Sequence, residues 1–392
     1  MIPYGRQDIS QADIDAVVDV LTSDFLTQGP LVERFEAAVA AYCGTPFALA
    51  ANSATSALHI ACCALDLGPG DRLWTSPTTF VASANCARYC GADVDFVDID
   101  PRTYNMSAER LAEKLAKAEK TGTLPKVVVP VHLCGQPCDM PAIKALADRY
   151  GFKIIEDASH AVGARYRTGA GQEFQPVGDG RFSDITVFSF HPVKIVTTGE
   201  GGMALTRNPA LAERLQRFRS HGITSNPAQM TPMPEDEIWN YQQILLGYNY
   251  RLTDIQAALG ISQMARIDDF IRRRHDIAAR YDREFASLPL TTPYQSPDIY
   301  SSYHLYPIRV SKEQGGRTQR EMYDHLQRSG INVNLHYIPV YRQPYFQKMG
   351  FERGYCPEAE AYFTQALSIP MYPTLTDDEQ GFVIGAIRDM YR

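Results

Sequence analysis

The sequence predicts an α/β protein built on a mainly parallel β-sheet, followed by a smaller α+β domain. Short apolar runs alternate with helical patterns from residue 47 to residue 156. Such alternation is typical of βαβ units whose strands form a parallel sheet covered by helices. The chain has 392 residues, more than a single hydrophobic core usually serves, so we expect two domains.

The expected elements follow in order along the chain. Ser10 should cap a first amphipathic helix over residues 10–22, and a second helix should follow over residues 31–42. Strands and helices then alternate at 47–51, 54–65, 71–76, 81–90, 94–98, 108–120, 126–132, 141–150 and 153–156.

The alternation breaks beyond residue 156. Two apolar runs at 185–190 and 202–206 lie close together in sequence, which predicts an antiparallel member in a mixed sheet. Residues 221–250 should be irregular, because they contain the pairs Asn226-Pro227, Thr231-Pro232 and Met233-Pro234.

The C-terminal part should begin with one long helix. We expect this helix over residues 253–288, capped by Thr253, then a strand over 303–310 and a helix over 318–329. We place the large domain with its N-terminal arm at residues 1–255 and the small domain at 256–392, hinged near residue 260.

Composition argues against several classes of protein. Hydrophobic residues make up 45% of the chain and charged residues 21%, which is ordinary for a globular protein, and the net charge of −7 argues against non-specific nucleic-acid binding. No apolar run reaches the roughly 18 residues of a membrane span, and residues 1–8 lack the apolar stretch of a signal peptide. We therefore expect a cytoplasmic protein without nucleic-acid or membrane partners.

The eight cysteines do not form the pattern of a disulfide framework. Cys86 and Cys90 are four residues apart, as are Cys134 and Cys138. Neither pair has zinc-knuckle spacing or a paired cysteine or histidine nearby in sequence. We expect buried, reduced thiols and no metal site.

Lys194 and Asp157 are the strongest candidates for catalysis. Lys194 lies between a strand and a turn that contains Gly199, Gly201 and Gly202, and Asp157 ends an apolar strand. A lysine amine can bond to the aldehyde of pyridoxal phosphate (PLP), and a buried carboxylate can keep the ring nitrogen of this cofactor protonated. The alternatives are a solvated lysine and a helix-capping aspartate. The pair predicts PLP as the cofactor.

A phosphate site is expected where one predicted helix begins. Ser53, Ala54 and Thr55 follow a strand and open this helix, so their free amide groups suit the cofactor phosphate. An ordinary capped helix start is the alternative. Ser189, five residues before Lys194, can reach the same phosphate or be an inward-facing strand serine.

Three further residues are candidates for cofactor contacts. Phe80 follows a strand end and can stack on the cofactor ring, or it is a core residue. His160 can lie near the phenolic oxygen of the cofactor or simply pack. Asn249 can be a phosphate ligand, or a turn residue before the helix that Thr253 caps.

In their order along the chain, these segments resemble the DegT/DnrJ/StrS sugar aminotransferases. The resemblance covers nearly the whole chain and rests on residues 52–55, 156–158, 189–194, 198–202 and 248–251. It implies a fold-type I, aspartate aminotransferase-like PLP enzyme. It also implies a homodimer with both active sites at the subunit interface, in which Asn249 reaches the partner's phosphate site.

Other segments, at 2–7, 25–30, 76–85 and 135–140, are similar to the branch of this family that serves pseudaminic acid biosynthesis. This similarity implies that glutamate donates an amino group to C4 of a UDP-linked 2-acetamido-2,6-dideoxy-4-keto-hexose. One departure is Ile195, where this branch is expected to have histidine. The candidate substrate contacts are Tyr4, Thr27, Arg251, Arg328, His336 and Tyr337, and the last four have surface or packing alternatives.

Three other functions remain open. A nucleotide-sugar 4-aminotransferase of the bacillosamine type would differ in its substrate. A sugar dehydratase of the same family carries histidine in place of the lysine, so Lys194 argues against it. A non-catalytic PLP-binding regulator needs a DNA-reading module, and residues 1–25 are too few to supply one and hold no basic cluster.

Overall fold

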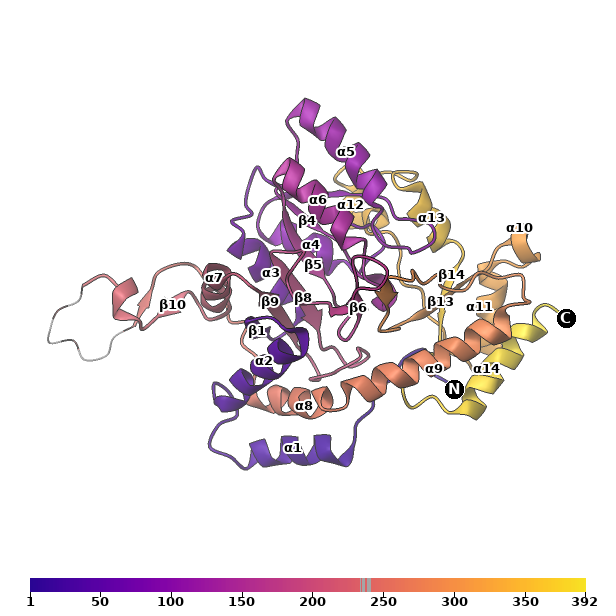
Figure 1. Cartoon of the computed structure of the whole chain (residues 1–392), viewed down its shortest axis with the longest axis horizontal. Helices are drawn as coiled ribbons and strands as arrows, with labels where there is room; N and C mark the ends of the chain where they lie inside the picture. The colour runs from indigo at the N-terminus through magenta and orange to yellow at the C-terminus, as the bar shows by residue number, and fades with distance from the viewer. Residues whose placement is uncertain (233, 235–236, 238–240) are drawn as a thin grey trace.

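The centre of the molecule is a seven-stranded sheet with the strand order β1-β9-β8-β5-β4-β2-β3 (Figure 1). The computed structural model describes every residue except 233, 235, 236 and 238–240. The strands of the sheet are β1 Phe47–Ala51, β2 Arg72–Thr75, β3 Asp93–Phe96, β4 Val127–Val129, β5 Lys153–Asp157, β8 Ile185–Ser189 and β9 Gly202–Thr206.

The sheet is mainly parallel, as predicted. Strands β2, β3, β4, β5 and β8 pair in parallel. Strand β9 pairs antiparallel with both β8 and β1, which confirms the expected antiparallel member. Side chains of β4 alternate between two hydrophobic clusters, with Val127 and Val129 in one and Val128 in the other. Burial on both faces explains the continuous apolar runs in the sequence.

Helices cover both faces of this sheet (Figure 1). One face packs against α3 Ala54–Ala64, α4 Ala82–Tyr89 and α7 Pro209–Arg219, and the other against α2 Pro30–Cys43, α5 Ala108–Thr121, α6 Met140–Tyr150 and α8 Asp254–Met264. The first helix, α1 Gln11–Leu21, packs on α8, and Ser10 caps it with its side chain as predicted. Short elements between these are η1 Leu133–Gly135, β6 Arg165–Tyr166 and β7 Gln175–Pro176.

The single long helix expected over residues 253–288 is wrong, because the structure has two helices there. Helix α8 ends before Ala265, and α9 Ile267–Phe285 begins after Arg266. The Arg266 guanidinium bonds to the Asp13 carboxylate at 2.5 Å and to the Asp8 backbone oxygen at 3.2 Å. The break between the two helices therefore coincides with the contact that holds the N-terminal segment. The predicted cap at Thr253 is confirmed.

The C-terminal residues build a separate hydrophobic cluster around a two-stranded sheet. Strand β13 begins at Tyr306, three residues later than predicted, and the helix predicted over 318–329 is confirmed as α11. The domain boundary at residue 255 stays a prediction. The remaining elements here are β12 Ile299–Tyr300, β13 Tyr306–Arg309, α10 Lys312–Gly315, α11 Gln319–Arg328, η3 Val340–Arg342, α12 Pro344–Gln347, α13 Pro357–Phe363, β14 Ala366–Ile369 and α14 Asp377–Asp389.

Residues 221–250 form only short elements where the structure describes them, as the proline pairs predicted. They are β10 Ile223–Thr224, η2 Pro227–Gln229 and β11 Gln242–Gln243. Met233 of the pair Met233-Pro234 lies outside the described residues. Strand β10 projects away from the body of the molecule beside α7 (Figure 1).

All eight cysteines are free thiols; six of them are buried as expected, while Cys63 and Cys90 are half-buried. Among the helices that the structure describes, none combines the length and the apolar character needed to cross a membrane.

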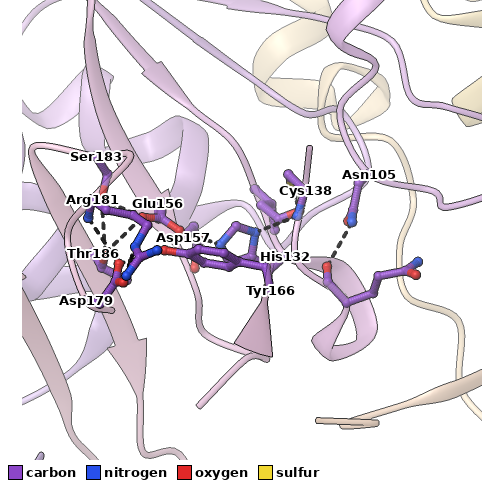
Figure 2. A network of polar contacts seen from close by, with 12 residues as sticks. Asn105, His132, Cys138, Glu156, Asp157, Tyr166, Asp179, Arg181, Ser183 and Thr186 are labelled. Carbon is purple, nitrogen blue, oxygen red and sulfur yellow. Dashed lines mark hydrogen bonds and ion pairs between the residues drawn. The ribbon is translucent and has the colours of Figure 1, made fainter. Parts of the chain in front are cut away.

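A buried polar network supports the carboxyl end of β5 (Figure 2). Side chains alternate along a strand, so Glu156 faces away from the side that Asp157 faces. The Glu156 carboxylate accepts hydrogen bonds from Ser183 and Thr186 and lies 2.8 Å from Nε2 of His132. Because Nδ1 of His132 accepts a bond from the Cys138 amide, Nε2 carries the proton and donates it to Glu156.

Removal of this carboxylate should destabilise the protein. Glu156→Ala leaves the buried His132 N–H without an acceptor and removes the shared acceptor of the Ser183 and Thr186 hydroxyls, which can then bond only to each other, so we expect the free energy of unfolding to fall by about 3 kcal/mol or more. Urea-induced unfolding measures the change. The control is Glu113→Ala, which removes only an exposed ion pair with Arg110 and should change stability by less than about 1 kcal/mol. Equal effects of the two substitutions would contradict the role of the network.

Candidate active site

A cavity of about 1000 Å³ opens at the carboxyl ends of β5 and β8, beside the start of α3. Helices α3 and α4 and the C-terminal segment around residues 334–338 form its walls. It brings together most of the side chains singled out in the sequence: Tyr4, Ser53, Ala54, Thr55, Phe80, Asp157, His160, Ser189, Lys194, His336 and Tyr337.

Lys194 lies in the turn after β8, where its amide donates to the backbone oxygen of His191 at 2.9 Å. Burial lowers the pKa of its amine from 10.5 to about 8, although the charges of Asp157 and Cys134 oppose this shift. An amine with such a pKa is partly uncharged near neutral pH, so it can act as a nucleophile and as a base.

Asp157 ends β5 and is buried, with 4% of its surface exposed. Its Oδ2 accepts a hydrogen bond from the Ser83 hydroxyl at 2.5 Å, and its Oδ1 accepts one from the Ser159 hydroxyl at 2.6 Å. Within the described part of the chain, no lysine, arginine or histidine nitrogen lies within 4 Å of this carboxylate. A buried carboxylate without a cationic partner is costly, and a protonated ring nitrogen of PLP would supply the missing charge.

The start of α3 forms an anion site beside these two residues. Ser53 caps the helix by accepting from the Ser56 amide. Helix N-termini leave their first amides without partners inside the helix, and such amides bind phosphate. A Cβ atom at Gly202 would come within 2.4 Å of the Ala54 nitrogen, so glycine lets β9 approach this helix end. The donor set therefore fits the phosphate of PLP.

Phe80 and Ser189 contribute to the walls of the same cavity. Phe80 is 59% exposed, which excludes the alternative of a core phenylalanine and leaves its ring face available for stacking. Ser189 pairs with Gly202 across β8 and β9, so its side chain lies beside the anion site at α3.

His160 and Tyr337 form a hydrogen-bonded pair in the cavity wall. Nδ1 of His160 accepts from the Cys134 amide at 3.2 Å, and Nε2 lies 3.2 Å from the Tyr337 hydroxyl. Burial and the nearby Lys194 charge hold the pKa of His160 well below its usual range, so the ring is neutral and Nε2 donates. The Tyr337 proton remains free for another acceptor.

His336 is the second neutral imidazole of the cavity. Burial, with help from Lys194, lowers its pKa to about 3, and its Nδ1 lies 2.9 Å from the Ser368 hydroxyl. Its ring is 5.3 Å from that of Tyr4, whose backbone oxygen accepts from the Met371 amide. The N-terminal arm therefore enters the cavity beside the C-terminal residues.

Four predicted residues lie outside this cavity. Thr27 is exposed and forms an antiparallel bridge with Thr253. Arg251 lines a separate groove of about 490 Å³ between α2 and β1. Asn249 is exposed, and its backbone oxygen lies 3.5 Å from the Asn52 side chain. Arg328 is exposed in the last turn of α11. Its positive charge interacts favourably with the negative end of the helix dipole there, so the alternative of a surface residue fits its position.

Ile195 faces the hydrophobic cluster that includes Phe35 and Phe190, and it is 4% exposed. It does not line the cavity. Isoleucine in place of the expected histidine at position 195 therefore affects the hydrophobic packing next to Lys194 and does not alter the lining of the cavity.

The sequence did not identify Ser83 and Ser159 as the hydrogen-bond partners of Asp157. Ser83 also lies 2.8 Å from the Thr79 hydroxyl, so it accepts from Thr79 and donates to Asp157. The signal was available, since Ser159 follows Asp157 by two residues and Ser83 falls within the segment at 76–85. Serines in turns after strands and in the first turn of helices are common, however, and the pattern alone does not show which of them points inward.

The pKa of Lys194 predicts how fast PLP attaches to the cofactor-free protein. Only the uncharged amine attacks the cofactor aldehyde. An amine is uncharged above its pKa, so the attachment rate should rise as pH increases through about 8 and level off above it. Stopped-flow absorbance measures the rate, with a free lysine derivative as the reference for titration of PLP itself. A rate that keeps rising up to the ordinary lysine pKa of about 10.4 would contradict the lowered value.

A family model for the DegT/DnrJ/EryC1/StrS aminotransferases matches residues 7–388. The chain is 38% identical over 394 aligned residues to the spore coat polysaccharide biosynthesis protein SpsC of Bacillus subtilis, covering 100% of this chain and 97% of that protein. It is 36% identical over 385 residues to the UDP-4-amino-4,6-dideoxy-N-acetyl-beta-L-altrosamine transaminase of Campylobacter jejuni, covering 98% and 96% of the two chains.

Solved structures show the same architecture. The aminotransferase PseC of Helicobacter pylori, described as involved in pseudoaminic acid biosynthesis, has a TM-score of 0.88 at 28% identity and covers 100% of this chain and 99% of its own. The PLP form of the putative sugar aminotransferase Spr1654 of Streptococcus pneumoniae has a TM-score of 0.86 at 29% identity, with 100% and 98% covered. The fold is therefore that of fold-type I PLP enzymes, as predicted, and the chain belongs to the DegT/DnrJ/EryC1/StrS family of PLP-dependent aminotransferases.

Proposed function

We propose that this enzyme transfers the amino group of glutamate to C4 of a UDP-linked 2-acetamido-2,6-dideoxy-4-keto-hexose. The product would be UDP-4-amino-4,6-dideoxy-N-acetyl-β-L-altrosamine, an intermediate of pseudaminic acid biosynthesis. The observation that carries an aminotransferase reaction is the cavity that joins Lys194, Asp157 and the start of α3. The relative from C. jejuni and the PseC structure support the choice of substrate.

PLP, when bound, accepts electrons from the donor and carries the amino group to the acceptor. Lys194 would hold the cofactor through its amine and, when that amine is free, would move a proton at the reacting carbon, a task that requires the uncharged amine. The lowered pKa of Lys194 supports both duties. Asp157 would hold the ring nitrogen protonated, and Ser83 and Ser159 fix the orientation of its carboxylate.

His160 and Tyr337 would orient groups that bind in the cavity. With Nε2 of His160 donating to the Tyr337 oxygen, the tyrosine can donate its own proton to an oxygen of the cofactor or of the sugar. His336 and Tyr4, side by side at the N-terminal arm, are proposed to contact the sugar. Their neutral, partly apolar surfaces suit a deoxy-hexose better than a charged group.

A coupled assay tests the substrate. The enzyme is given glutamate with UDP-linked 4-keto-hexoses that differ in the configuration at C5, and NMR reads the configuration at C4 of the product. Amination of the L-configured keto sugar, to give the altrosamine product, supports the proposal. Preference for the D-configured sugar would instead identify a bacillosamine-type 4-aminotransferase, and amination of neither sugar would overturn both assignments.

We also propose a homodimer with shared sites, in which Asn249 serves the phosphate site of the partner subunit. Asn249 lies outside the cavity of its own chain. The segment that leads to it projects from the body and exposes large apolar side chains, with Leu246 76% exposed and Tyr241 66% exposed. Exposed apolar side chains gathered in one segment are typical of contact surfaces. Thr27 and Arg251, also outside the cavity, are proposed to act across the same interface.

Mixing two inactive variants should restore activity. One chain carries Lys194→Ala and the other Asn249→Trp. In a mixed dimer one site contains both substitutions, while the other contains neither. At equal proportions half of the dimers are mixed and each has one working site, so activity should reach about a quarter of the wild-type value.

Two controls accompany the mixture. Size-exclusion chromatography with differently tagged chains shows whether subunits have exchanged, and mixing either variant with a double variant should restore nothing. Exchange without recovery of activity would show that each site uses residues of one chain only.

A further inference from the structure

Three potential metal ligands lie together outside the Lys194 cavity. A ring nitrogen of His59 and the sulfur atoms of Cys63 and Cys90 all lie within 4.8 Å of one another. The two sulfur atoms are 3.8 Å apart. None of these three residues lines the cavity described above, and the proposed reaction uses none of them.

Two neighbouring helices bring the three side chains to one place. His59 and Cys63 are four residues apart in α3, so they lie on the same face of this helix. Cys90 is the C-terminal cap of α4, which packs against α3. Helices that are fixed on the central sheet hold the cluster, so its geometry is set before any ligand arrives.

The spacing of the cluster suits a tetrahedral zinc ion. Zinc binds thiolate sulfur at about 2.3 Å, which places two sulfur ligands of a tetrahedral site about 3.8 Å apart. Cys63 and Cys90 already have this separation. Three protein ligands, one imidazole and two thiolates, with a water molecule in the fourth position, form a known type of zinc coordination.

The hydrogen bonding of His59 is a second observation that indicates a bound ligand. It is only 5% exposed, and its Nε2 has no hydrogen-bond partner among the described residues. Its Nδ1 lies 3.1 Å from the Tyr250 hydroxyl. Metal-binding histidines usually hold one ring nitrogen by such a bond and use the other for the metal, so an N–H at Nδ1 leaves the lone pair of Nε2 for an ion.

We propose that His59, Cys63 and Cys90 form a binding site for a thiophilic divalent cation, zinc. On binding, both thiols release their protons to solvent and each sulfur forms a bond to the metal, together with Nε2 of His59. This site could not be recognised from the sequence pattern, because its ligands come from two helices and follow no zinc-knuckle spacing. The expectation of no metal site rested on the spacing of two cysteine pairs, Cys86 with Cys90 and Cys134 with Cys138, and on partners nearby in sequence, so it did not consider partners on α3.

The bound ion would link α3 to α4 and would fix the His59 ring, which packs against the segment before α8. The His59 ring packs 4.6 Å from that of Tyr248, and Tyr248 stacks on Tyr250 at 5.0 Å. These two tyrosines flank Asn249. The cluster lies outside the Lys194 cavity, so its occupancy should affect the order of this segment rather than the proton transfers at Lys194.

Metal content and cobalt binding test the proposal. The PLP-loaded enzyme, without a histidine tag, is treated with chelator, dialysed and titrated with zinc or with cobalt(II), whose tetrahedral thiolate complexes have intense visible bands. We expect one zinc ion per chain by elemental analysis and the tetrahedral cobalt spectrum. Cys63→Ser, Cys90→Ser and His59→Gln should each weaken binding by about 100-fold or more.

The matched control is Cys356→Ala, which removes a buried thiol at the start of α13 and should leave metal binding unchanged. Circular dichroism and the bound-cofactor absorbance verify that each variant is folded. Three outcomes would overturn the proposal: no zinc bound to the folded wild-type enzyme at micromolar concentration, binding that survives the three substitutions, or a stable disulfide between Cys63 and Cys90 in the freshly purified protein.

Discussion

Lys194→Ala is expected to abolish transamination while the protein stays folded and binds PLP without a covalent bond. Among the described residues that line the cavity, Lys194 is the only one with a side-chain amine, so the substitution removes both the covalent attachment and the positioned base. Loss of a positioned base alone costs about 10²–10⁴-fold in rate, so we expect turnover to fall at least about 1000-fold. The anion site at α3 and the Asp157 carboxylate remain, which is why the cofactor should still bind and should now be removable by dialysis.

Two comparison variants separate the roles of charge, size and basicity. Lys194→Arg keeps a long cationic side chain, but a guanidinium stays protonated at all relevant pH values, so this variant should be as inactive as the alanine variant. Lys117→Ala removes an exposed lysine on α5 and should retain full activity. A small primary amine added to the Lys194→Ala enzyme should restore part of the rate. Turnover of this variant near the wild-type rate would exclude Lys194 as the base.

The central sheet could be predicted because its strands are buried on both faces. Such strands are continuous apolar runs, and the helices between them have clear amphipathic patterns, so the βαβ order was visible in the sequence. The break between α8 and α9 was not visible, since Ala265 and Arg266 are neither proline nor glycine. Contacts of Arg266 with Asp8 and Asp13 accompany it, and contacts between residues more than 250 positions apart leave no local pattern.

The residues of the candidate site also fall into those that the sequence could predict and those whose contacts it could not predict. Lys194, Asp157 and Ser53 were found because each follows a strand at the edge where parallel sheets bind ligands. His160 and Tyr337 could be named but not paired, because their hydrogen bond joins two distant parts of the chain. Asn249 and Arg251 lie outside the cavity of this subunit, so their roles depend on a partner surface that a single sequence does not describe.

Asp157→Asn is the second substitution with a large expected effect. The amide has nearly the same shape as the carboxylate and can still accept hydrogen bonds from Ser83 or Ser159, so the fold and the cavity should persist. It carries no charge, however, and cannot hold a ring nitrogen in its protonated form. Loss of one such electrostatic contact typically costs about 10²–10³-fold in rate, and we expect a decrease of this size in the half-reaction with glutamate.

A direct measurement distinguishes this mechanism from simple loss of packing. The NMR shift of a ¹⁵N-labelled cofactor ring reports whether the nitrogen is protonated, and it should change from the protonated to the unprotonated value in Asp157→Asn. The matched control is Asp139→Asn, because Asp139 caps α6 from an exposed position and asparagine caps helices equally well. If the ring stayed protonated in Asp157→Asn and the rate were unchanged, another group would have to supply the charge. The described structure places no lysine, arginine or histidine nitrogen within 4 Å of the Asp157 carboxylate, so a protonated ring nitrogen of bound PLP would supply the cation that this buried carboxylate lacks.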